Sequence, residues 1–237
     1  LPFFFNYRPK RMQQMKAAAE LLELPHLKPV IPGDTRWCSL QRTSERLIAI
    51  YQQVLLALEN IASIETGKVQ AEANGYYTFL RNFENLFLLR VFNAVLLPVQ
   101  ILNKGLQASA LGAIDAVEQS KATITQLKSI DVRSIYVDAR TQRQDIEEKL
   151  SANFAHKCFS VGSCPDEILS EKLFKETKRY ISTLVESMQE RLVDSIAPLA
   201  ELLPKLSKKE TIIDWVAGCH AVGLGEDFAL QQSTDGL

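Results

Sequence analysis

Residues 76–97, YYTFLRNFENLFLLRVFNAVLL, are apolar on almost every side of the helix that their spacing predicts. A helix that is apolar all round is normally buried between other helices. The segment therefore predicts the core helix of an all-helical fold, and its apolar excess also suits a surface that meets segments outside this chain. We expect Pro98 to kink or split this helix.

The rest of the chain shows the same helical periodicity. Apolar residues recur at steps of three and four, which predicts further helices at residues 9–24, 39–64, 108–129 and 134–155 and from residue 166 onward. Only residues 3–5 and 27–31 are candidate strands, and both are very short. The predicted fold class is mainly all-α.

The bulk composition limits the classes of partner. The 237 residues carry a formal net charge of -1, so any site for a polyanion must be local. We expect no segment to reach the apolar span of about 18 residues that a membrane helix needs, and we expect no membrane partner. The chain begins with Leu1, so we expect a part of a longer protein. No charged segment precedes the apolar residues 1–5, so we do not expect these residues to be a signal peptide.

The cysteines predict a reduced intracellular compartment. Four cysteines are scattered along the chain, which is not typical of a disulfide framework. A zinc site built from His156, Cys158, Cys164, Cys219 and His220 lacks the paired Cys-x2-Cys spacing. We favour buried or loop cysteines and expect no bound metal or other cofactor in this chain.

Catalytic motifs are also missing from the sequence. It contains no glycine-rich phosphate loop ahead of a helix, no Gly-x-Ser-x-Gly and no His-Glu-x-x-His. Pairs of acids such as Glu147-Glu148 lie on polar helix faces, where a solvated carboxylate is the usual state. We predict no catalytic residue in this chain.

A basic cluster lies at the start of the helix predicted at residues 9–24 and within it. Arg8, Lys10, Arg11 and Lys16 have no acid between them. Four such charges suit contacts with phosphate. They equally suit the solvated face of a helix, which is the commoner situation.

The second distinctive stretch is DTRWCS at residues 34–39, at the start of a predicted helix. One role for Trp37 is structural: the indole packs at the mouth of the helix while Asp34 pairs with Arg36. The other role is binding, because an indole face stacks on an unpaired base and a guanidinium pairs with a phosphate. The two roles are compatible.

These motifs occur in an order that resembles the hAT superfamily of transposases. Asn6, Pro9, Lys10 and Arg11 match a first helical element, a proline-rich gap follows, and Thr35, Arg36, Trp37 and Ser39 then open a helix. The similarity is greatest to the hAT-like proteins of animals in which a zinc-finger region is fused ahead of a transposase-derived body. It extends loosely through most of the helical chain, and only the Thr-Arg-Trp stretch is specific.

The resemblance implies a domain organisation. Residues 1–38 would be the exit of a ribonuclease-H-like α/β core, residues 39–222 an all-helical insertion domain, and residues 223–237 a flexible tail. In this family the tryptophan lies near the catalytic centre, so the resemblance implies DNA-binding roles for Trp37, Arg36, Lys10 and Arg11. It further implies a nuclear protein whose partner is DNA through the intact parent, with a homo-oligomer or protein partners as further candidates.

The chain departs from the family in its catalytic set. The family's two Asp and one Glu bind Mg²⁺ or Mn²⁺, and none of them matches a position in this chain. Because two-metal cleavage needs converging carboxylates, we predict no nuclease activity for this chain alone. We expect a domesticated, catalytically inactive DNA-associated protein. The alternatives are part of an active transposase and an unrelated helical scaffold for protein partners.

Overall fold

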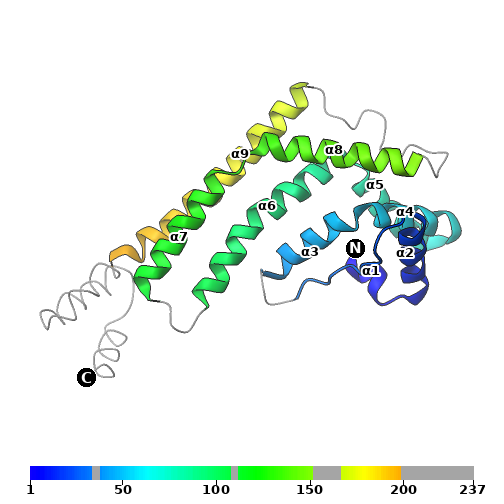
Figure 1. The fold of residues 1–237 in the computed structure, drawn as a ribbon, viewed down its shortest axis with the longest axis horizontal. Helices are drawn as coiled ribbons and strands as arrows, with labels where there is room; N and C mark the ends of the chain where they lie inside the picture. Colours follow the sequence, from blue (N-terminus) through cyan, green and yellow to red (C-terminus); the bar gives the residue numbers. More distant parts are fainter. Residues whose placement is uncertain (34–37, 108–111, 152–166, 199–237) are drawn as a thin grey trace, which may run out of the picture. The chain divides into compact units, whose positions relative to one another are not determined.

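The computed structural model describes residues 1–33, 38–107, 112–151 and 167–198, and every regular element within them is a helix (Figure 1). In chain order the elements are α1 (Pro2–Asn6), α2 (Pro9–Leu21), α3 (Cys38–Ala49), α4 (Tyr51–Ile64), α5 (Gly67–Leu80), α6 (Phe83–Leu106), α7 (Ala113–Lys128), α8 (Val132–Ser151), α9 (Glu167–Met188) and a π-helix, η1 (Gln189–Asp194). The described ranges contain no strand, and the predicted all-α class is confirmed.

Both predicted strands were wrong. The aromatic run at residues 3–5 lies in α1, where Pro2 occupies the first turn and fixes a helical φ. Residues 24–33 form no regular element. They contain three prolines, which lack the N–H group that a strand ladder needs. The ribonuclease-H-like remnant proposed for this end of the chain stays a prediction.

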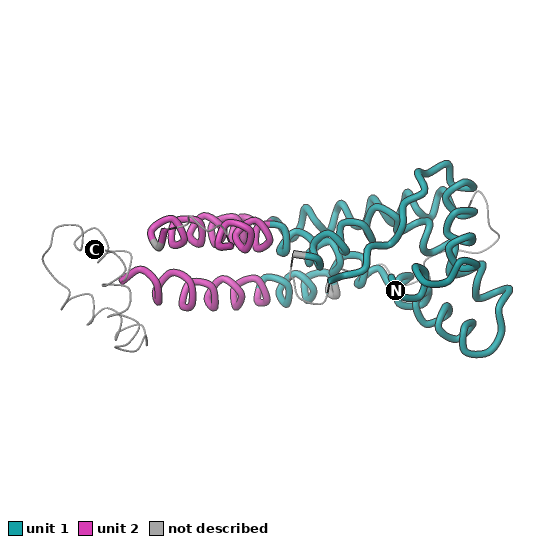
Figure 2. The backbone as a smooth tube through the Cα atoms, turned by 90° about the horizontal axis from the view of Figure 1, so that it is seen from below, with its two compact units in different colours: residues 1–97, 131–178 teal, residues 98–130, 179–237 magenta. Residues whose placement is uncertain are grey.

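The chain divides into two compact units, which Figure 2 distinguishes by colour. Unit 1 comprises residues 1–97 and 131–178, and unit 2 comprises residues 98–130 and 179–237. In unit 1, α1 packs on α2, α2 on α4, and α4 on α5. The largest fully buried side chains of unit 1 are Phe5, Met15, Ile50, Tyr51, Leu55, Leu56, Leu58, Phe83, Leu86 and Phe87.

In unit 2, α7 packs against η1. The side chain of Gln119 on α7 lies so close to Gly105 on α6 that an added Cβ would overlap it. Glycine at position 105 therefore permits this close approach. The domain boundaries predicted after residues 38 and 222 stay predictions.

Two helices predicted as continuous are broken. The helix predicted at residues 39–64 is α3 followed by α4, bent by 73° at Ile50. No glycine or proline marks this break, and the Ile50 side chain is fully buried. The core segment at residues 76–97 is divided between α5 and α6, where the side-chain Oδ1 of Asn82 accepts a hydrogen bond from the Glu84 N–H at 2.9 Å. Asn82 thus caps α6.

Helix α6 is longer and more uniformly apolar than we expected. It continues through Pro98 and contains an 18-residue window with a mean hydropathy of 1.7, which meets the length and composition of a membrane span. The expectation that no segment reaches that composition was wrong. Core helices of soluble proteins have the same property, and in α6 the side chains of Leu86, Phe87 and Val91 are buried. The absence of a membrane partner stays a prediction.

Candidate nucleic-acid interface

The Thr-Arg-Trp motif occupies residues 35–37, which the structure does not describe. Arg36 and Trp37 lie outside the described residues, so their predicted roles stay predictions. The residues on either side of the motif come together, because the Ser39 hydroxyl donates a hydrogen bond to the Gly33 carbonyl oxygen at 3.2 Å. Ser39 therefore lies inside the first turn of α3 and connects the start of this helix to the segment before the motif.

Arg11 is held within the fold. Its guanidinium lies 4.0 Å from the centroid of the Phe4 ring, and its Nη1 donates a hydrogen bond to the Phe4 carbonyl oxygen at 3.0 Å. These contacts join α2 to α1. The other N–H groups of a guanidinium still allow a phosphate contact, which stays a prediction.

Lys10 differs from its neighbour. It is exposed, and among the described residues no acid pairs with it. Lys16, by contrast, pairs with Glu20 at 3.6 Å. Of the two predicted DNA-binding side chains on α2, Lys10 is thus the one directed at solvent.

Helix α1 and its C-cap residue carry two exposed aromatic rings just before these cations in the chain. Phe3 and Tyr7 are 59% and 67% exposed, with ring centroids 6.2 Å apart and an angle of 19° between the planes. Arg8 follows Tyr7 directly and is also exposed. We call Phe3, Tyr7, Arg8 and Lys10 the α1–α2 surface. Its cations were predicted from the sequence and its aromatic rings were not, because residues 3–5 were a candidate strand and no role was predicted for Tyr7.

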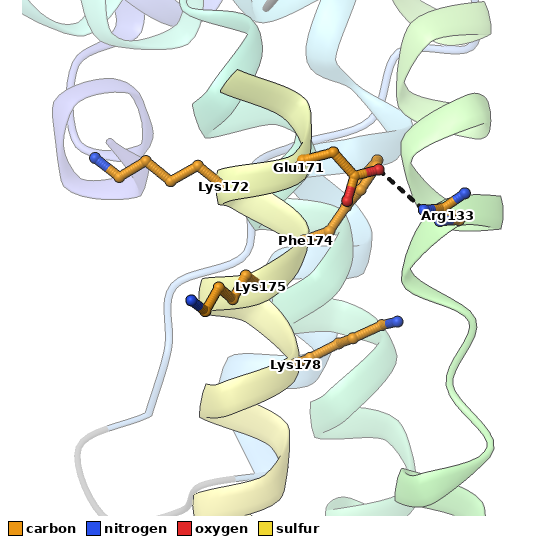
Figure 3. Close-up of a pocket in the computed structure, with 6 residues that line it drawn as sticks. All are labelled: Arg133, Glu171, Lys172, Phe174, Lys175 and Lys178. Atoms are coloured by element: carbon orange, nitrogen blue, oxygen red, sulfur yellow. Dashed lines mark hydrogen bonds and ion pairs between the residues drawn. The ribbon is translucent and has the colours of Figure 1, made fainter. Parts of the chain in front are cut away.

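A second basic region, which sequence reasoning missed, lies between α8 and α9. Arg133, Glu171, Lys172, Phe174, Lys175 and Lys178 line an open depression of about 510 Å³, which we call the α8–α9 hollow (Figure 3). Arg133 pairs with Glu171 at 2.9 Å. Lys178 points toward the α8 side of α9, while Lys172 and Lys175 point away from it (Figure 3). The spacing of three residues between successive lysines, which places them near one another on a helix, could have indicated this region from the sequence.

The floor of this hollow is an aromatic cluster. Phe174 is only 8% exposed, and its ring makes edge contacts with Tyr136 at 5.1 Å and Phe87 at 6.3 Å between centroids. The Arg133 guanidinium lies 5.6 Å from the Phe174 centroid. The cluster stabilises the packing of three helices and offers no free ring face to a ligand.

A network of polar side chains connects α6 with its neighbours α8 and α3. Arg90 Nε donates to Gln142 Oε1 at 2.8 Å, and Gln142 Nε2 donates to the Ile48 carbonyl at 3.3 Å. Burial lowers the pKa of the Arg90 guanidinium, and the charge of Asp138 acts in the opposite direction. An arginine remains protonated under such conditions, so the network connects α6, α8 and α3 without acid–base chemistry.

The described part of the chain shows no group of three or more His, Cys, Asp and Glu side chains able to hold a metal ion. The residues of the alternative zinc site, at positions 156–164 and 219–220, lie outside the described ranges. The expectations that this chain binds no metal and that an intact family core binds Mg²⁺ or Mn²⁺ therefore both stay predictions.

Comparison with known proteins adds no relative. The sequence matches no protein-family model, no curated protein and no solved structure.

Proposed function

We propose that this chain is part of a transposase-derived, DNA-associated nuclear protein similar to the hAT superfamily, and that it does not cut DNA by itself. One observation carries the proposal. The Thr35-Arg36-Trp37 motif lies between a basic helix and a long region whose described residues form only helices as regular elements, in the order that the family shows.

The charges and exposure of α2 support a DNA contact. Residues 1–19 contain four cations and no acid, so this end of the chain attracts a polyanion although the whole chain is nearly neutral. Lys10 is exposed and without an acidic partner among the described residues, so a phosphate contact breaks no bond of the fold. In this proposal Lys10, Arg11 and Arg36 contact phosphates, and Trp37 stacks on a base.

The proposal is tested by DNA binding of the 237-residue chain, measured by fluorescence anisotropy on a labelled duplex with an unpaired end. We expect binding that weakens as salt rises, because phosphate contacts release counterions. Trp37→Ala should weaken the affinity about 5- to 150-fold, which corresponds to the about 1–3 kcal/mol of one base stacked on an aromatic ring. Trp215→Ala, at the only other tryptophan, is the matched control.

Absence of binding at low salt contradicts the proposal. Equal losses of DNA affinity in the Trp37 and Trp215 variants would indicate that Trp37 has a structural role. Circular dichroism melts of each variant separate lost contacts from lost folding. The flanking coding sequence then distinguishes a domesticated parent from an active transposase, since only the latter needs an intact Asp, Asp and Glu set.

A specific observation favours the second candidate, a helical scaffold for protein partners. Leu88 and Phe92 lie one turn apart on α6 and are 45% and 37% exposed. Exposed apolar side chains on one helix face are typical of protein-binding surfaces. If the scaffold is correct, sedimentation should show self-association that Leu88→Ser with Phe92→Ser abolishes, in a chain that does not bind DNA.

A further inference from the structure

The aromatic residues of α1 and of its C-cap, Tyr7, differ in exposure. Phe4 and Phe5 point into the core and are buried, whereas Phe3 and Tyr7, one helical turn apart, remain mostly exposed. Their rings are nearly parallel. Two large aromatic faces at adjacent positions offer a stacking surface for planar groups.

Tertiary contacts fix this short helix in place. An isolated five-residue helix is not stable in water. Asn6 Nδ2 donates to the Pro29 carbonyl at 2.8 Å, Arg11 Nη1 donates to the Phe4 carbonyl, and the Phe4 ring meets the edge of Tyr76 on α5 at 5.5 Å. The two exposed rings therefore stand on an ordered base, which lowers the entropy lost when a ligand binds.

The charge beside the rings is entirely positive along the chain. Arg8 and Lys10 are exposed, no ion pair within the described ranges includes either of them, and the first acid in the sequence is Glu20. On α5, Glu72 lies one turn before Tyr76 and is paired with Lys68 at 4.0 Å. Aromatic faces next to unneutralised cations match the two chemical parts of a nucleotide, its base and its phosphate.

The distance between the rings selects for unpaired nucleotides. Successive bases on one strand of a duplex are separated by about 3.4 Å. The centroids of Phe3 and Tyr7 are 6.2 Å apart, so one base on each ring requires a strand whose bases are unstacked. A paired base inside a duplex, moreover, presents neither of its faces to a protein side chain.

We propose that the α1–α2 surface binds single-stranded DNA, with successive bases on Phe3 and Tyr7 and their phosphates on Arg8 and Lys10. The inference rests on the proposed function, since it specifies the form of DNA that a DNA-associated chain holds at this end. It adds a second stacking site to the one predicted at Trp37.

The test compares single-stranded and duplex DNA in binding to the 237-residue chain. The probe is fluorescein-labelled oligothymidylate of about ten nucleotides, a length within the usual site size of single-strand-binding folds. The paired variant Phe3→Leu with Tyr7→Leu keeps apolar bulk and removes the ring faces. Phe79→Leu, with the same 59% exposure on α5, is the matched control.

We expect oligothymidylate to bind more tightly than a duplex of equal length. The paired variant should weaken oligothymidylate binding by at least about 30-fold, the equivalent of about 1 kcal/mol per base, and change duplex binding less than twofold. Phe79→Leu should change neither. The single variants Phe3→Leu and Tyr7→Leu, each with a smaller loss, keep the test decisive if the paired variant unfolds.

The possible failures are distinguishable. Normal duplex binding together with unchanged oligothymidylate binding in the paired variant overturns this inference and leaves the proposed function intact. Absence of binding to both probes contradicts the proposed function itself. Tighter binding of oligouridylate overturns the choice of DNA, and a paired variant that only abolishes self-association in sedimentation assigns the rings to a second copy of the chain.

Discussion

The α1–α2 surface and the α8–α9 hollow both gather cations around aromatic residues, yet they differ in two ways. At α1–α2 the rings of Phe3 and Tyr7 are exposed, whereas the ring of Phe174 in the hollow is buried under Arg133. No acid occurs in residues 1–19, whereas Glu171 neutralises one cation of the hollow. If the α1–α2 surface binds DNA as proposed, the number of cations alone does not distinguish it from the hollow. The exposure of the ring faces and the absence of counter-charges then make the difference.

The largest expected effect contrasts the rings of the two regions. Phe174→Ala should lower the free energy of unfolding by about 3–5 kcal/mol, because it removes the centre of the cluster with Phe87 and Tyr136. Phe3→Ala should cost less than about 1 kcal/mol, since most of that ring is already in water. Urea unfolding of both variants measures the difference. Equal costs would mean that the two rings do not differ in role.

The next effect concerns two tyrosine hydroxyls. Tyr51, buried in α4, donates to the Leu80 carbonyl at 2.6 Å, and Tyr51→Phe should cost about 1–3 kcal/mol by leaving that oxygen without its partner. Tyr7→Phe should leave stability unchanged and should also retain oligothymidylate binding, because the ring is kept. Thermal melts and anisotropy measure both quantities. A stability loss in Tyr7→Phe would show that this side chain belongs to the fold.

A smaller effect, on the salt dependence of DNA affinity, distinguishes the cations of the two regions. Replacing Arg8 and Lys10 by Gln should reduce the slope of log affinity against log salt for single-stranded DNA by about 1.4, the value for two phosphate contacts. Replacing Lys172 and Lys175 by Gln, an equal change of charge, should reduce it by less than half as much. The reverse order would make the α8–α9 hollow the principal phosphate site.

The smallest effect is expected at the ion pair of the hollow. Arg133 and Glu171 are both well exposed, so Glu171→Gln should change the free energy of unfolding by less than about 1 kcal/mol. The same substitution removes a negative charge and should slightly strengthen DNA binding to the whole chain at low salt. A large stability loss would show that this pair, rather than the aromatic cluster beneath it, holds α8 and α9 together.

Periodicity alone predicted most of the helices. The apolar spacing of α2, α7, α8 and α9 is regular, and these helices occur close to the predicted residues. The break at Ile50 was not predictable in this way, because no proline or glycine marks it. Asn82, by contrast, is of a residue type that often caps helices, so this break was predictable. The continuous apolar pattern on both sides of Asn82 instead favoured a single helix.

The candidate sites were less predictable than the helices, since they depend on residues that only the fold brings together. Arg11 looked equivalent to Lys10 in sequence, and only its contact with Phe4 shows that it holds α1. Arg133 and Glu171 are 38 residues apart, and local spacing does not predict such a pair. The roles of Arg36 and Trp37 remain as the sequence predicted them.

Photochemical cross-linking of single-stranded DNA that carries 5-iodouracil tests the central claim most directly, because the reaction joins the base to an aromatic ring in contact with it. We predict that mass spectrometry of the cross-linked chain finds the modified peptide at the N-terminal end, on Phe3 or Tyr7. Cross-links confined to α9, or tight binding without any cross-link in residues 1–8, would contradict the account.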